Sequence, residues 1–146
     1  VRQVVRDLDL TKQYDGLSET LGEAVLRPTK IYAKQIATLI EKVDIKGIAH
    51  ITGGGFIENL PRMLPDGLKI IINKESWPVL PIFDLISEIG KVEENEMYNT
   101  FNMGIGMAIA VDKNIADDVV KAACELGEKA YIIGEVTEGK EKIEIC

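Results

Sequence analysis

The sequence predicts an α/β (α+β) fold, in which helices cover a mixed, mainly antiparallel sheet. Stretches with apolar residues at helical spacing alternate with short β-branched runs along most of the 146-residue chain. Two apolar runs at the end are separated only by a polar turn, which is typical of a hairpin. This order favours antiparallel pairing under a helical layer. With 46% hydrophobic residues the chain can bury one core but not two, so we expect a single domain over 1–146.

The first elements differ in how clearly the sequence marks them. Residues 1–27 are polar and irregular, which predicts an arm or an incomplete element ahead of a core over 28–146. Thr29 can then cap a helix that ends near Gly47. The apolar positions of that helix share one face and are Tyr32, Ile36, Leu39, Ile40 and Val43.

Two short interior strands are expected next. The run 48–52 suits a buried strand that leads into a turn of three glycines, 53–55, and then into a brief helix through Ile57 and Leu60. A turn at 65–67 precedes the β-branched run 68–72, which predicts the second strand.

The middle of the chain alternates helix and strand. Pro81 suits the first turn of a helix that Gly90 caps, and acidic residues at 93–96 precede a short helix through Met97 and Tyr98. The segment 105–111 is the clearest strand, and because every second residue is Gly or Ala we expect something large to cover that face.

The last third predicts a helix and a hairpin. Asn114 can cap the helix, which Gly127 ends, and Cys124 is expected in it as an inert core residue. Strands over 130–136 and 142–145 should pair through a turn containing Gly139.

Charge and composition exclude several classes of function. The chain has 17 basic and 24 acidic residues and a formal charge of −7, which opposes binding to nucleic acid or anionic membranes. No stretch reaches the roughly 18 apolar residues that span a bilayer. Cys124 and Cys146 fit neither a metal cluster nor a disulfide framework, so we expect a reducing, cytoplasmic location. A small anionic metabolite remains compatible, because backbone amides can form a local positive site.

The segment 49–62 carries the most chemistry. His50 and Thr52 stand at the end of a predicted strand, and glycines at 53–55 can expose several N–H groups to a phosphate or carboxylate. Asn59 and Arg62 can add donors from the following helix. A triple glycine also serves any tight strand-to-helix turn, and this one matches neither the P-loop nor the dinucleotide fingerprint. His50 is equally compatible with a hydrogen-bonded structural role.

A second candidate segment spans 100–107. Thr100 and Asn102 precede a strand in which Gly104 and Gly106 would permit close backbone approach. A turn and a strand packed under a helix explain the same spacing.

Together these segments resemble the signature of the aminoimidazole ribonucleotide synthetase family, the phosphoribosylformylglycinamidine cyclo-ligases. The resemblance covers essentially the whole chain and rests on LGE at 21–23, PTKIY at 28–32, HITGGG at 50–55, ENLPR at 58–62, SWP at 76–78, EMY at 96–98 and TFNMGIG at 100–106. A triple glycine recurs in the wider superfamily, whereas the blocks 58–62 and 97–106 narrow the choice to this family.

The resemblance implies a ligase of purine biosynthesis that uses ATP and Mg²⁺ to close formylglycinamidine ribonucleotide into aminoimidazole ribonucleotide. It also implies that this chain is the C-terminal domain without its opening strand, and that the ATP-binding N-terminal domain lies outside it. The full-length enzyme is expected to be a homodimer. The fragment alone should be inactive, and it should self-associate weakly through the sheet edge that the missing strand leaves open.

The expected site follows from both lines of reasoning. His50 is the candidate catalytic residue, with an orienting role rather than proton transfer because no base-orienter pair is visible. Candidate ligands of a phosphorylated small-molecule substrate are Thr52, Gly53, Gly54, Gly55, Asn59, Arg62 and Asn102. No metal ligand is predicted. Two alternatives stay open: a stand-alone anion-binding or regulatory module, and a structural interaction domain without a ligand.

Overall fold

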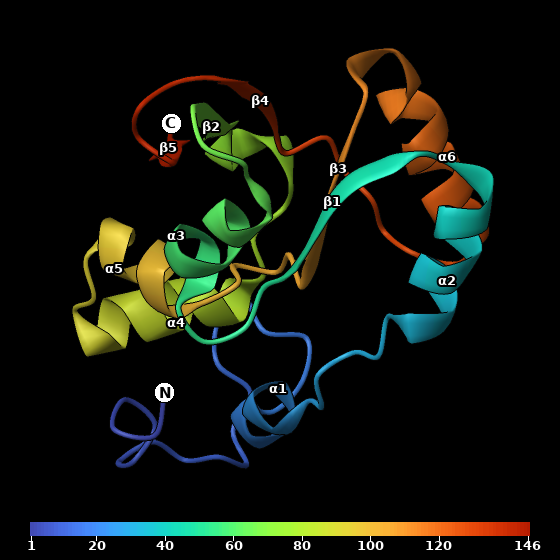
Figure 1. Ribbon diagram of the computed structural model, residues 1–146. Coiled ribbons are helices and arrows are strands. Elements are labelled where there is room, and N and C mark those ends of the chain that lie inside the picture. Colours follow the sequence, from blue (N-terminus) through green and yellow to red (C-terminus); the bar gives the residue numbers. More distant parts are fainter.

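The computed structural model describes residues 1–146 and shows two lobes joined by a pair of strands (Figure 1). Helices α2 (Ala33–Lys42) and α6 (Ala116–Glu125) form one lobe, and α3 (Gly55–Asn59), α4 (Pro81–Gly90) and α5 (Glu94–Thr100) belong to the other. Strands β1 (Ile45–His50) and β3 (Met107–Val111) run between the lobes. None of the helices has the length and apolar composition that crossing a bilayer requires.

The strands form two sheets instead of one. β1 pairs antiparallel with β3, with Ala49 opposite Ala108 and an irregularity between Ile45 and Gly47. In the second sheet, β2 (Leu68–Ile72) lies between β4 (Gly134–Glu138), which is antiparallel to it, and β5 (Ile143–Ile145), which is parallel. The predicted mixed, mainly antiparallel α+β architecture is therefore confirmed.

The predicted C-terminal hairpin is wrong, because β2 separates β4 from β5. β2 buries Ile70 and Ile72, so the sheet gains most when this strand is central, whereas every residue of β4 is exposed. The loop after β4 passes β2, and the Gly139 N–H donates to the Gly67 carbonyl over 3.0 Å. The polar turn thus connects two strands on opposite sides of a third.

Aromatic packing centres the main core. The Phe56 and Trp77 rings are stacked with centroids 5.5 Å apart, and Tyr98 meets Phe56 edge-on at the same distance. Trp77 Nε1 donates to the carbonyl of Met103 over 3.0 Å. The cluster joins α3, α5 and the loop before β3, and its twelve buried members are Ala49, Ile51, Phe56, Leu60, Ile70, Ile72, Trp77, Ile86, Met97, Tyr98, Met103 and Ala108.

Several predicted boundaries and roles need correction. Thr29 does not cap α2, whose N-cap is Tyr32, and α2 ends at Lys42 because the chain enters β1 three residues before the predicted strand. Asn114 lies in a 3₁₀ turn (Lys113–Ile115) and does not cap α6. Cys124 is exposed, since α6 buries Val119 and Ala123 on a different face.

Shorter elements complete the chain. The N-terminal segment contains α1 (Leu21–Leu26), which starts with a capping box between Thr20 and Glu23. Two further 3₁₀ turns, Leu60–Met63 and Lys74–Ser76, follow α3 and β2.

Candidate functional site

The glycine turn (residues 53–55) connects β1 to α3, and its backbone requires glycine. Gly54 and Gly55 adopt φ angles of 90° and 53°, in the left-handed region. A Cβ on Gly55 would lie 2.1 Å from the carbonyl oxygen of Tyr98, so no other residue fits there. At Gly53, by contrast, a Cβ would meet nothing within 4 Å, which leaves one side of the turn open to solvent.

The fold brings the two candidate segments together. The Ile51 N–H donates to the carbonyl of Gly106 over 2.9 Å, which extends the β1–β3 pairing to the start of the turn. At Gly55 the carbonyls of Tyr98 and Phe101 both approach the backbone. Residues 50–55 and 98–106 therefore line one region.

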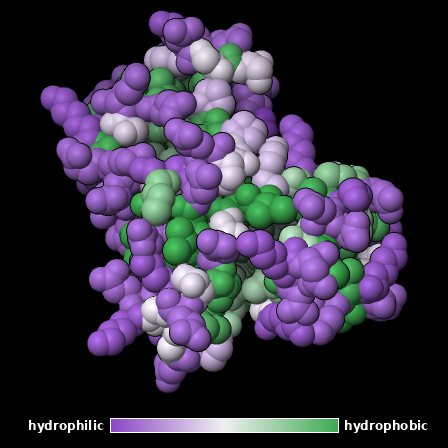
Figure 2. Space-filling view, turned by 90° about the horizontal axis from the view of Figure 1, so that it is seen from above, coloured by the Kyte–Doolittle hydropathy of each residue, from purple (hydrophilic) through white to green (hydrophobic).

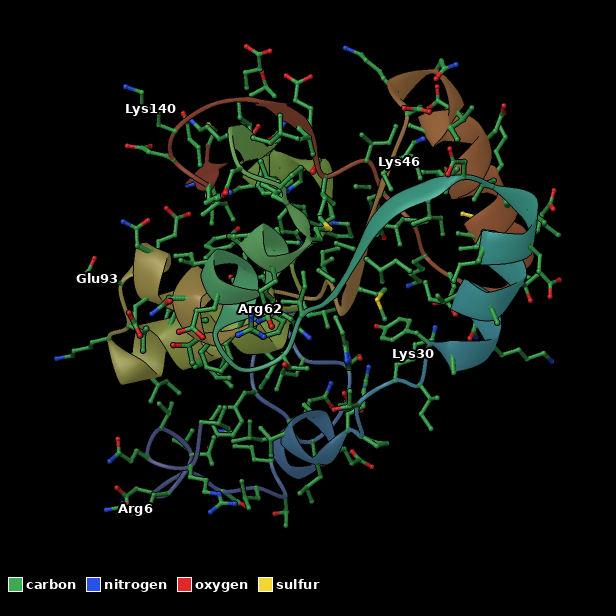
Figure 3. All side chains as sticks on the ribbon, in the orientation of Figure 1. Arg6, Lys30, Lys46, Arg62, Glu93 and Lys140 are labelled. Atoms are coloured by element: carbon green, nitrogen blue, oxygen red, sulfur yellow. The ribbon has the colours of Figure 1, made fainter.

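The side chain of Asn59 stabilises the glycine turn through hydrogen bonds. This side chain is buried, and Nδ2 donates to the carbonyl oxygens of Gly55 over 2.8 Å and of Gly53 over 3.2 Å. Its Oδ1 accepts a hydrogen bond of 3.1 Å from Nη1 of Arg62. Asn59 thus shapes the turn and orients the guanidinium, and Figure 3 shows Arg62 within the lobe that contains α3.

The turn presents donors that the protein itself does not use. The N–H groups of Gly53, Gly54 and Ile57 donate no hydrogen bond within the chain, whereas the Gly55 N–H donates to the Thr52 carbonyl. Unpaired amides of this kind and a nearby guanidinium can bind an anion.

One carboxylate opposes that use. A Cβ on Gly54 would lie 2.4 Å from Oε2 of Glu58, so this side chain lies against the turn. Glu58 also forms an exposed ion pair with Arg62, with Nη2 and Oε2 3.8 Å apart. An incoming anion must therefore displace the Glu58 carboxylate or be weakened by it. The sequence did not predict that Glu58 would compete with an anion at the turn, although Glu58 belongs to the ENLPR motif at 58–62.

The remaining predicted site residues lie around the turn. The side chains of His50 and Thr52 are exposed, and neither forms a hydrogen bond within the protein. Asn102 Oδ1 accepts from the Gly104 N–H over 3.1 Å and so stabilises its own turn, while its amide nitrogen has no partner in the chain. Because the His50 ring has no hydrogen-bonding partner, the geometry supplies no orienting group for a general base.

Tyr32 is a second residue that sequence reasoning did not assign to the site. A Cβ on Gly106 would lie 2.2 Å from the Tyr32 hydroxyl, so the Tyr32 side chain lies against Gly106, just before β3. The expected cover over the rest of the small-residue face stays a prediction. The ring meets His50 edge-on with centroids 5.9 Å apart. Burial raises the pKa of the Tyr32 hydroxyl.

Comparisons with known proteins give a consistent result. The sequence profile described as "AIR synthase related protein, C-terminal domain" matches residues 3–146. Phosphoribosylformylglycinamidine cyclo-ligase of Acetivibrio thermocellus is 58% identical over 137 residues, which are 94% of this chain and 40% of that protein. The protein of the same name from Bacillus mycoides is 54% identical over 133 residues, 91% of this chain and 38% of the relative.

A solved structure shares the fold. The crystal structure of Escherichia coli HypE superimposes with a TM-score of 0.62 at 27% identity, covering 80% of this chain and 35% of that one. The chain thus spans about 40% of the length of the curated relatives it matches.

Proposed function

Because the chain belongs to the family of AIR synthase related proteins, through their C-terminal domain, we propose that it forms the C-terminal part of a phosphoribosylformylglycinamidine cyclo-ligase. The full enzyme would convert formylglycinamidine ribonucleotide to aminoimidazole ribonucleotide in cytoplasmic purine biosynthesis. The observation that carries the proposal is the glycine turn, where amides without a partner in the chain lie near Arg62 and the turn is open at Gly53. The names of the relatives support the same activity.

Each candidate residue receives a role in this proposal. The amides of Gly53 and Gly54 and the guanidinium of Arg62 bind a phosphate of the substrate or nucleotide. Thr52 and Asn102 contribute a hydroxyl and an amide to the same site, and His50 orients the substrate. Asn59 and Gly55 preserve the shape of the turn without touching the ligand.

ATP and Mg²⁺ belong to the proposed reaction. Phosphorylation of the substrate's amide oxygen by ATP would let the amine attack and close the ring, with release of ADP and phosphate. The glycine turn fits one phosphate group, but the chain brings no three His, Cys, Asp or Glu side chains together to hold a metal ion. We therefore assign the main nucleotide and Mg²⁺ segment, and the homodimer contact, to the part of the relatives that this chain does not span.

Reconstitution tests the enzymatic proposal. The chain would be mixed with the complementary part of the Acetivibrio thermocellus relative, and ATP-dependent formation of aminoimidazole ribonucleotide would be measured. We expect activity in the mixture and none with either part alone. An Arg62→Ala chain should restore at least 10-fold less activity, because one phosphate contact is worth about 1.5–3 kcal/mol. A Lys140→Ala chain, changed in an exposed loop, serves as the matched control.

A stand-alone anion-binding module is the second candidate, because every donor at the glycine turn comes from this chain. That function predicts phosphate binding by the chain, and no activity in the mixture. Sustained ATP turnover by the chain alone would contradict both proposals.

A further inference from the structure

A separate pocket lies beside the glycine turn, on the α2 side of β1. It has a volume of about 450 Å³ and is open to solvent. The residues that matter here are Tyr32 and Ile36 of the α2 region, His50 and Met107 at the paired ends of β1 and β3, and Thr29 and Lys30 at the mouth. We call it the Tyr32 pocket.

The walls of the Tyr32 pocket suit a flat ring. Tyr32 and His50, whose rings meet edge-on with centroids 5.9 Å apart, both line the pocket and give it aromatic walls that a planar ligand can contact. Ile36 and Met107 supply apolar contact, and a thioether packs well against aromatic rings. Pockets for small molecules commonly combine such apolar walls with a few polar groups.

Two hydroxyls without partners and one ion-paired ammonium stand at the same place. The Tyr32 hydroxyl and the Thr29 hydroxyl form no hydrogen bond within the chain. The Lys30 ammonium is paired with Glu128 and lies 5.9 Å from the centroid of the Tyr32 ring. Figure 3 shows Lys30 at the base of α2, on the lobe opposite to Arg62. These groups can bond to hydroxyls of a sugar, which a purely apolar pocket could not satisfy.

Spacing connects the pocket to the glycine turn. The chain is still extended at Ile51, which pairs with Gly106, so His50 and Thr52 project to the same side of the strand. Two residues of extended chain advance about 7 Å. A ligand that contacts both the His50 ring and the glycine turn must therefore span this distance, which a sugar ring between a heterocycle and a phosphate can do.

We propose that the Tyr32 pocket binds the heterocycle and ribose of a ribonucleoside monophosphate whose phosphate rests on the glycine turn. The inference rests on the proposed function and adds to it the position of the nucleoside end and the residue that recognises it. Tyr32 packs against the ring, and its hydroxyl together with Thr29 bonds to the sugar. Gly106 is required because any side chain there would displace Tyr32.

Calorimetric titration of the chain with three probes tests the proposal: inorganic phosphate, ribose 5-phosphate and aminoimidazole ribonucleotide. We expect the ribonucleotide to bind at least 10-fold more tightly than inorganic phosphate. Tyr32→Ala should remove that advantage and leave inorganic phosphate within 2-fold of its original affinity. Ile40→Ala truncates an exposed apolar side chain on α2 that lies outside the Tyr32 pocket, and it should change neither affinity.

A second measurement keeps the test valid if Tyr32→Ala unfolds the chain. In the unchanged protein, amide chemical shifts of Tyr32, His50 and Met107 should move with the ribonucleotide and not with inorganic phosphate. Equal affinities for the three probes would contradict the proposal that the Tyr32 pocket binds the nucleoside end of the ligand. Equal effects of Tyr32→Ala and Ile40→Ala would contradict it as well. Failure of the glycine-turn site has a different signature: Arg62→Ala would leave phosphate affinity unchanged while the ribonucleotide still depends on Tyr32.

Discussion

The buried amide of Asn59 holds the backbone of Gly55 in place, with Nδ2 2.8 Å from its carbonyl oxygen. The same nitrogen reaches the carbonyl of Gly53, while Oδ1 accepts from Arg62. One side chain therefore determines both the shape of the turn and the direction of the nearby guanidinium. A ligand that depends on the turn depends on Asn59 without touching it.

Asn59→Ala should lower the free energy of unfolding by about 1–3 kcal/mol, because it removes a buried hydrogen bond to the Gly55 carbonyl and a partly buried one to Gly53. Urea denaturation measures the loss. Asn99→Ala is the matched control, since that amide makes only a 3.4 Å contact with Glu96, and it should lie within about 0.5 kcal/mol of the original protein. Equal effects of the two substitutions would show that the Asn59 amide does not stabilise the glycine turn.

Gly55→Ala should be far more damaging than Gly53→Ala. At Gly55 the new Cβ meets the Tyr98 carbonyl in a left-handed backbone, and we expect a loss of about 3 kcal/mol or more, or failure to fold. At Gly53 the Cβ enters open space, so stability should change by at most about 0.5 kcal/mol. Thermal unfolding followed by circular dichroism distinguishes them.

Glu58→Gln should raise the affinity for inorganic phosphate about 3-fold at low salt. The substitution removes the negative charge that lies against Gly54 and releases Arg62 from its ion pair. The gain should shrink at high ionic strength, since both groups are exposed. Glu88→Gln on α4 is the control. An unchanged phosphate affinity of Glu58→Gln would show that the Glu58 carboxylate does not oppose anion binding at the turn.

Glu23 should make the stability of the N-terminal segment depend on pH. Hydrogen bonds from the Thr20 hydroxyl and then from the Thr20 N–H lower the pKa of Glu23. Because the pKa of Glu23 is lower in the folded state, its contribution to stability is complete at pH values above its unfolded-state pKa. It is lost as the pH falls through the folded-state value.

The difference in melting temperature between the original chain and Glu23→Gln should accordingly be larger at pH 7 than at pH 3. Glu88→Gln should show no such dependence. A pH-independent difference at position 23 would mean that the capping box does not depend on the charge.

Self-association should involve the free edge of β1. Since the Ile51 N–H points toward β3, alternation directs the N–H groups of Ile48 and His50 away from it. Ile48 and Ile40 are exposed apolar residues near that edge, and Figure 2 shows apolar surface gathered between the lobes. Such an edge is a template for another strand.

Ile48→Lys should therefore shift sedimentation velocity profiles toward monomer at high concentration, because a charge at an edge opposes pairing. Ile89→Lys, an exposed position on α4, should not. A strict monomer at every concentration would contradict the predicted association.

Local patterns in the sequence predicted several elements well. Strand 68–72 and the helix from Pro81 occur as expected, because β-branched residues and a proline at the first helical turn act through the backbone itself. Helix caps were less predictable: Thr29 and Asn114 have suitable side chains, but neither bonds to a helix end. The prediction of a C-terminal hairpin was wrong because β4 and β5 follow each other along the chain, yet the more apolar β2 lies between them in the sheet.

By itself, the sequence determined the α+β class, the glycine turn and the family, because these depend on residue types and their spacing along the chain. Only the tertiary structure decided which groups remain free. It committed Asn59 to the turn, placed Glu58 against Gly54, and set Tyr32 over Gly106 beside His50. These contacts join residues whose proximity depends on how β1, β3 and the helices pack, and no local pattern encodes that packing.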